Sequence, residues 1–160
     1  MIRTLFVLCT ILSLSILWGC PKKQVIVAPK RKVLSYGKDH KAWRTISKRK
    51  IISPHHGNTE EEIFANGQAY RTSTGKQAMP YEEGSIFVML RYKDGELQPL
   101  AYIMKKMDST YHPNYNNWKY STVRVSDWTI ERDGKLADCI TCHYKHTNRD
   151  FVPLMQKDGM

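Results

Sequence analysis

The sequence lacks a second long apolar run, and it lacks any excess of positive charge beyond its first third. The net charge of the 160 residues is +10, and the excess lies between residues 22 and 50, where 11 Lys and Arg face one acid, Asp39. From residue 51 onward, 13 basic residues oppose 14 acidic ones. A nearly neutral body offers no basic surface for nucleic acid. A single apolar run excludes a multi-span membrane protein.

Internal repeats and low-complexity tracts are also absent from the sequence. Hydrophobic residues make up 41% of the chain and charged residues 25%, which is an ordinary globular composition and excludes a fully disordered protein. A chain of this length holds one domain, or one domain with appendages.

The one long apolar run, Leu5 to Leu17, follows Arg3 and is shorter than the roughly 20 residues of a membrane span. It ends in Leu17-Trp18-Gly19-Cys20, where a small residue precedes a cysteine, as in the cleavage box of bacterial lipoproteins. We therefore predict a lipoprotein signal peptide over residues 1–19, with Cys20 as the lipidated mature N-terminus. An uncleaved anchor helix is the alternative. Both predict a periplasmic or otherwise extracytoplasmic protein anchored to a membrane.

Residues 20–42 combine two prolines, Pro21 and Pro29, with many charges and little apolar periodicity, which predicts a basic tether. Such a segment lies near anionic lipid headgroups, with each basic residue contributing about 1 kcal/mol at most. A merely solvated linker is the alternative. Residues 43–160 are the predicted folded domain.

The pattern of this domain predicts an α+β fold, mainly an antiparallel β-sheet with a few helices. Thr59-Glu60-Glu61-Glu62 has the form of a capping box and predicts a helix that fades by Gly75. Residues rich in β-formers predict strands over 85–92, 97–107, 118–125 and 128–131. The first two of these strands are joined by a hairpin turn at Asp94-Gly95.

The most informative residues are Cys139-Ile140-Thr141-Cys142-His143. Two cysteines three residues apart with an adjacent histidine predict one covalently bound haem c, with Cys139 and Cys142 as thioether ligands and His143 as the proximal ligand of the iron. The count of four cysteines agrees, because Cys9 leaves with the signal peptide and Cys20 takes lipid. A zinc site that includes His146 and a disulfide or thiol redox pair are the alternatives.

Several short motifs accompany this attachment sequence in a fixed order. They are Ile63-Phe64-Ala65-Asn66, Pro80 to Val88 with Gly84, Ile103-Met104-Lys105-Lys106, Trp118-Lys119-Tyr120 and Asp150-Phe151-Val152. Together, from about Trp43 to Leu154, they resemble the cytochrome P-460 family, which includes the beta-type cytochromes c-prime. The resemblance implies an antiparallel sheet domain, a haem near the C-terminus with an open distal iron site, electron transfer to an exported redox partner, and often a homodimer.

The resemblance implies one of two activities. One branch oxidises hydroxylamine with a lysine-cross-linked haem and a distal acid, whereas the other binds nitric oxide or similar gases in an apolar distal pocket. Lys76 is the first candidate for the cross-link, ahead of Lys105 and Lys106, with an ordinary loop lysine as the alternative. Phe64 and Phe87 are candidates for the distal pocket, with core packing as the alternative. The catalytic residues are not identified, and whether the protein is an enzyme stays open.

Two other functions remain open. A sixth iron ligand would make a pure electron-transfer cytochrome c, and the side chains that could supply it are His55, His56, His112, His146, Met104 and Met107. Among these, the His55-His56 pair is preferred. A haem-based gas sensor or scavenger without turnover is the third function.

Overall fold

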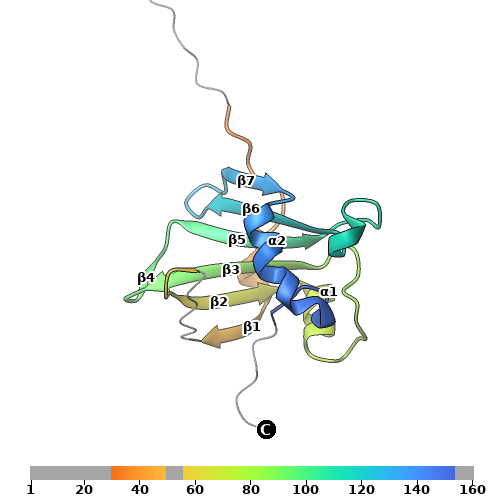
Figure 1. Cartoon of the computed structure of the whole chain (residues 1–160). Helices are drawn as coiled ribbons and strands as arrows, with labels where there is room; N and C mark the ends of the chain where they lie inside the picture. The colour runs from red at the N-terminus through yellow and green to blue at the C-terminus, as the bar shows by residue number, and fades with distance from the viewer. Residues whose placement is uncertain (1–29, 50–55, 154–160) are drawn as a thin grey trace, which may run out of the picture.

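One seven-stranded antiparallel sheet organises residues 30–49 and 56–153, which are the residues that the computed structural model describes (Figure 1). Neighbouring strands follow the order β1-β2-β3-β5-β6-β7, and β4 pairs only with β3. The strands are β1 (Arg44–Arg49), β2 (Glu60–Ala65), β3 (Ile86–Lys93), β4 (Glu96–Leu97), β5 (Leu100–Lys106), β6 (Trp118–Arg124) and β7 (Ile130–Gly134). The predicted α+β class with a mainly antiparallel sheet is confirmed. The signal peptide, Cys20 and His55 lie outside the described residues.

Within residues 30–49 and 56–153, two α-helices accompany the sheet, and α2 lies across one of its faces (Figure 1). The helices are α1 (Gly67–Ser73) and α2 (Ala137–His143), with shorter 3-10 helices η1 (His40–Ala42), η3 (Pro113–Tyr115) and η4 (Tyr144–Arg149). Among the residues described, no helix is both long and apolar enough to cross a membrane.

The strand register separates the side chains into two faces. One cross-strand row runs from Phe64 through Val88 and Ile103 to Ser121, and the adjacent row runs from Ala65 through Phe87 and Met104 to Tyr120. Because successive residues of a strand point to opposite sides, these two rows lie on opposite faces of the sheet.

The first face, the apolar face, is buried by a cluster around Val88 and Ile103. Its buried members are Leu34, Phe64, Ile86, Val88, Leu90, Ala101, Ile103, Val123 and Trp128. Residues N-terminal to β1 help to cover it, since Leu34 is 3% exposed and its N–H donates to the carbonyl of Trp128 at 3.0 Å. Gly37 has φ +88°, and a Cβ there would lie 3.2 Å from Cγ2 of Val88, so only glycine allows this close approach.

The segment from Val33 to Ala42 therefore belongs to the packed domain. Val33 forms a β-bridge with Thr129, and His40 is 4% exposed. The prediction of a tether as far as residue 42 is wrong for these residues. Their overall composition is charged, and it does not reveal that a few apolar side chains, such as Leu34, pack the segment against the sheet. Residues 20–29 of the predicted tether lie outside the described residues.

The second face, the α2 face, carries an aromatic cluster beneath α2. Its buried members are Ala65, Ala69, Tyr81, Phe87, Trp118, Tyr120, Ile140, Phe151 and Val152. Ile140 comes from α2 itself, so burial of this one side chain anchors the helix to the sheet.

The helix predicted from Thr59 is wrong in its first half. Residues Glu60–Ala65 form β2, which pairs with both β1 and β3. Alternation explains this outcome, because Ile63 and Ala65 contact the α2 cluster while Phe64 enters the apolar one. The helix begins only at Gly67, where Asn66 is the N-cap and its Oδ1 accepts from the Ala69 N–H at 3.1 Å.

The other predicted strands are confirmed with shifted ends. The strand predicted over 97–107 is interrupted at Gln98-Pro99, so that β4 ends at Leu97 and β5 begins at Leu100. Proline has no N–H to donate to the ladder, which explains the break. The last predicted strand begins later, at Ile130, because Trp128 adopts a left-handed turn conformation with φ 60°.

Candidate functional site

The attachment sequence forms the short helix α2. Asp138 lies in its first turn, where a negative charge favours the helix dipole, and it is paired with Arg132 at 2.6 Å. Cys139, Cys142 and His143 are spaced i, i+3 and i+4, so they lie on one side of the helix. The local sequence thus brings two thiols and one imidazole together before any long-range contact is made.

His143 is held in one tautomer by a backbone carbonyl. Its Nδ1 lies 2.7 Å from the oxygen of Phe151, and since a carbonyl only accepts, Nδ1 carries the proton and Nε2 the lone pair. Burial lowers the pKa of His143 although the Phe151 carbonyl raises it, so the neutral ring is favoured. A neutral imidazole with an oriented Nε2 is the form in which histidine binds iron.

The aromatic floor beneath these groups is Tyr120. Its ring centroid lies 5.2 Å from that of His143 in an edge-on contact. Burial, Cys139 and Asp150 raise the pKa of Tyr120, and its buried hydroxyl has no hydrogen-bond partner. Both thiols are free, and burial followed by Asp138 raises the pKa of Cys139 to about 11.

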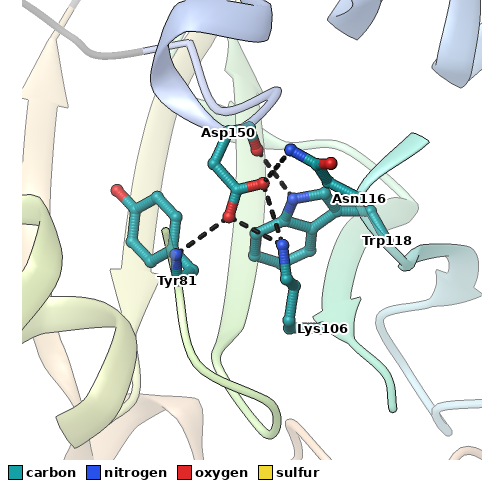
Figure 2. Close-up of polar contacts among 5 residues, drawn as sticks. All are labelled: Tyr81, Lys106, Asn116, Trp118 and Asp150. Atoms are coloured by element: carbon teal, nitrogen blue, oxygen red, sulfur yellow. Dashed lines mark hydrogen bonds and ion pairs between the residues drawn. The ribbon is translucent and has the colours of Figure 1, made fainter. Parts of the chain in front are cut away.

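The chain that follows η4 is fixed by the carboxylate of Asp150, which is 4% exposed (Figure 2). This carboxylate accepts from Lys106 Nζ at 2.7 and 2.8 Å, from the Tyr81 N–H at 2.9 Å and from Asn116 Nδ2 at 2.8 Å. The carbonyl of Asp150 accepts from Trp118 Nε1 at 2.7 Å. Burial lowers the pKa of Lys106 even beside this carboxylate.

Asp150 and the next residue have left-handed backbones. Their φ angles are 52° for Asp150 and 65° for Phe151, a conformation that costs a non-glycine residue about 1–2 kcal/mol. The contacts of the Asp150 carboxylate and carbonyl stabilise this conformation against its cost. The same turn presents the Phe151 carbonyl to His143.

A second group of polar side chains lies on the α2 face, near the start of β2 and the end of β3. Glu61 and Arg91 are cross-strand partners, and Glu61 Oε1 lies 2.6 Å from Nδ1 of His56, with the Glu61 side chain 5% exposed. Arg91 donates to the His56 carbonyl at 2.8 Å and its guanidinium lies 4.5 Å from the ring centroid of Tyr102. The ring centroid of His56 lies 5.4 Å from that of Tyr102, so these side chains form one group on the α2 face.

The structure separates the two phenylalanines predicted for one distal pocket. Phe87 packs in the α2 cluster with Tyr81 and Trp118, whereas Phe64 lies on the apolar face beside His40. The expectation that both line one pocket is wrong, because the register places them on opposite sides of the sheet. Phe87 remains on the side of the attachment helix.

The three lysines considered for a haem cross-link lie in different surroundings. Lys76 is exposed in the loop after α1. Lys105 extends over the ring of Tyr36 with its Nζ 4.5 Å from the centroid, on the apolar side, and Lys106 is bound to Asp150. Of these three lysines, only Lys106 therefore lies on the α2 face, and its ammonium group is paired with Asp150.

The other residues proposed as a sixth ligand are dispersed. Met104 contacts the α2 cluster, His112 packs against Tyr115 before η3, and His146 lies in η4 three residues after His143. Among the described residues, His, Cys, Asp and Glu side chains form no group of three or more that could hold a metal ion. The zinc alternative therefore gains no support.

Sequence reasoning missed the His56–Glu61–Arg91 group and the pairing of Lys106 with Asp150. The alternation of Glu61 and Ile63 could have placed Glu61 on the α2 face if Glu60–Ala65 had been interpreted as a strand. Asp150 and Lys106 are separated by 44 residues, and no local pattern joins them.

The residues of the α2 face fit a covalently attached haem. Cys139, Cys142 and the oriented Nε2 of His143 are the donor set for thioether bonds and iron ligation. The buried Tyr120 hydroxyl, Arg91 Nε and Ser47 Oγ lack partners, and each lies at a strand position of this face or beside it. Buried polar groups need a partner, and the propionate carboxylates of a haem are hydrogen-bond acceptors of that kind.

Comparison with curated protein sequences gives no match. The family model described as Cytochrome P460 matches residues 37–153. This range begins within the segment that covers the apolar face and ends just after the Asp150 turn, so it includes both faces of the sheet and the attachment helix. The chain therefore belongs to the Cytochrome P460 family, whose members are haem proteins that act on small nitrogen species.

Proposed function

We propose that the chain is an exported, lipid-anchored cytochrome c with one covalent haem and an open distal iron site. There it binds or oxidises small nitrogen species such as nitric oxide or hydroxylamine and passes electrons to an exported partner. The observation that carries this proposal is α2, which places two thiols and the oriented His143 over the aromatic floor. The apolar run that ends at Cys20 supports export and the anchor.

When bound, the haem supplies the one-electron chemistry, and the protein supplies attachment, orientation and burial. Cys139 and Cys142 would hold the haem through two thioether bonds. His143 offers Nε2 as the proximal donor.

The polar group of His56, Glu61 and Arg91 is suited to proton transfer. Glu61 is buried and its Oε1 is hydrogen-bonded to His56 Nδ1, so a proton can be held at either atom. Oxidation of hydroxylamine releases protons, and a buried acid–base pair beside the substrate would accept them. We propose Glu61 and His56 for this role.

The lysines favour a haem without a cross-link. In β2, β3, β5 and β6, register places Lys93 and Lys106 on the side of α2. Lys93 is exposed at the hairpin turn, and Lys106 is engaged by Asp150. Lys76 is exposed as well. These surroundings support the binding of nitric oxide or similar gases, as in the c-prime-beta branch, ahead of hydroxylamine oxidation by a lysine-cross-linked haem. A gas sensor or scavenger would use the same site.

A six-coordinate electron carrier is the second candidate, and His56 is the observation that favours it. His56 binds Glu61 and its ring centroid lies 5.4 Å from that of Tyr102, two residues whose strand positions are on the α2 face. For His56 to bind iron through Nε2, its Nδ1 would keep the bond to Glu61, which is the arrangement that orients a ligating histidine.

Titration of the reduced full-length protein with nitric oxide and carbon monoxide tests these functions. An open site gives a high-spin ferrous spectrum that changes on addition of either gas, in the wild type and in His56→Ala alike. A low-spin spectrum that resists both gases, and becomes gas-sensitive only in His56→Ala, would establish the six-coordinate carrier instead. His146→Ala is the matched control, because His146 follows His143 by only three residues, in η4, and so cannot easily reach the opposite face of the haem.

A further inference from the structure

Nδ1 of His143 donates its proton to one carbonyl, and that carbonyl belongs to a turn that residues far away in the sequence also hold. Phe151 accepts from His143 at 2.7 Å, and both Asp150 and Phe151 have left-handed φ angles. The orientation of a peptide carbonyl follows the backbone angles on either side of it. Backbone bonds within the turn, such as that from the Phe151 N–H to the His146 carbonyl at 2.9 Å, hold it locally. Contacts that hold Asp150 from outside the turn therefore help to orient the acceptor of His143.

Asp150 is fixed from three parts of the sheet domain (Figure 2). Lys106 at the end of β5 contributes both ammonium contacts, Tyr81 contributes a backbone N–H, and Asn116 contributes its side-chain amide. Trp118 at the start of β6 binds the Asp150 carbonyl, and Lys106 Nζ lies 5.0 Å from the centroid of its ring. The carboxylate and the carbonyl of one residue are thus both bound.

We propose that the Lys106–Asp150 pair is a positioning device for the proximal histidine, a role that rests on the proposed haem function. The pair holds the left-handed turn, the turn aims the Phe151 carbonyl at Nδ1, and this hydrogen bond fixes the tautomer, the ring orientation and the electron donation of Nε2. A stronger bond at Nδ1 makes an imidazole a better donor to ferric iron. The ion pair would therefore keep the reduction potential of the haem low.

The test compares haem-loaded full-length variants of this pair with variants of a matched pair on the other face. Lys106→Met and Asp150→Asn remove the buried charges, whereas Lys119→Met and Asp133→Asn break the Lys119–Asp133 pair, whose contact distance is 2.8 Å. The measurements are the midpoint reduction potential and, for a five-coordinate ferrous haem, the iron–histidine stretching frequency by resonance Raman spectroscopy. We expect Lys106→Met and Asp150→Asn to raise the potential and lower the frequency, and the control variants to change neither.

Asn116→Ala keeps the test decisive if loss of the buried charge prevents folding. It removes one neutral contact to Asp150 and leaves Lys106 in place, so a smaller shift in the same direction is expected. An unchanged potential and frequency in folded Lys106→Met, Asp150→Asn or Asn116→Ala would overturn the positioning role while leaving the haem function intact. A wild-type chain that carries no haem would overturn both.

Discussion

The two faces of the sheet are both covered, but they are built from different side chains. The apolar face is filled by aliphatic residues with Phe64 and Trp128. Its buried histidine, His40, donates through Nδ1 to the Gly37 carbonyl at 2.8 Å. The α2 face combines an aromatic cluster with Glu61, Lys106 and Asp150, all at most 7% exposed.

This difference shows where stability and chemistry are located. Buried charges cost free energy unless they are paired, so a face that needed only to be covered would not carry them. The apolar face is of this kind, because its core cluster is made of hydrophobic side chains. The α2 face holds the Lys106–Asp150 ion pair and the buried carboxylate of Glu61, which is the composition expected of a functional site.

The largest effect is expected on the apolar face from Ile103→Ala. Ile103 is 2% exposed, and truncation of such a core side chain costs about 2–5 kcal/mol of unfolding free energy. Because Ile103 points away from α2, the folded variant should retain the wild-type haem absorption spectrum. Chemical denaturation and absorption spectroscopy measure the two effects. A changed spectrum in the folded variant would show that the faces are coupled.

On the α2 face, Trp118→Phe removes the donor to the Asp150 carbonyl, now 2.7 Å away. A buried carbonyl left without its partner costs about 1–3 kcal/mol, so the stability loss should be smaller than that of Ile103→Ala. Unlike that variant, it should also alter the ferric electron paramagnetic resonance spectrum. An unaltered spectrum would argue that the two faces differ only in packing.

Tyr120→Phe tests whether the orphaned hydroxyl serves the haem. In a chain that cannot attach haem, made by Cys139→Ser with Cys142→Ser, loss of an unsatisfied buried hydroxyl should be neutral or stabilising by up to about 1 kcal/mol. In the haem-loaded protein the same change should be destabilising. Thermal unfolding of both backgrounds decides this, and an equal effect in the two would mean that the hydroxyl has no haem-linked partner.

The smallest effect is expected from Asp138→Asn at the exposed start of α2. Arg132 lowers the pKa of Asp138 to about 2, so the pair stabilises the fold above the ordinary pKa of aspartate, and this contribution disappears as the pH falls through about 2. Both side chains are more than half exposed, and salt screens such pairs. Acid unfolding at low salt should be less steep between about pH 4 and pH 2 in the variant, and high salt should remove the difference. A persistent difference at high salt would contradict this assignment.

The sequence predicts the features that local spacing encodes. Cys139, Cys142 and His143 share a helix side because of their spacing, and the strands of the central sheet follow from alternation and turn residues. The prediction of a helix from Thr59 was wrong because Thr-Glu-Glu-Glu is compatible both with the start of a helix and with the strand that forms between β1 and β3. Only tertiary pairing decides between the two.

Other features depend on which residues meet across the sheet. Phe64 and Phe87 look equivalent in the sequence, but strand register places them on opposite faces. Lys106 and Asp150 form a pair across 44 residues, and His56 meets Glu61 through a turn that the predicted helix concealed. Each of these contacts became visible only once the register was known.

The central claim is that Cys139 and Cys142 hold a haem covalently on the α2 face. The most direct test is a pyridine haemochrome spectrum of the full-length exported protein after denaturation and acidic extraction of free haem. The account predicts one haem per chain that stays with the polypeptide, and loss of that haem in Cys139→Ser combined with Cys142→Ser. Haem that is fully extracted from the wild-type chain, or that remains attached in the double variant, would contradict it.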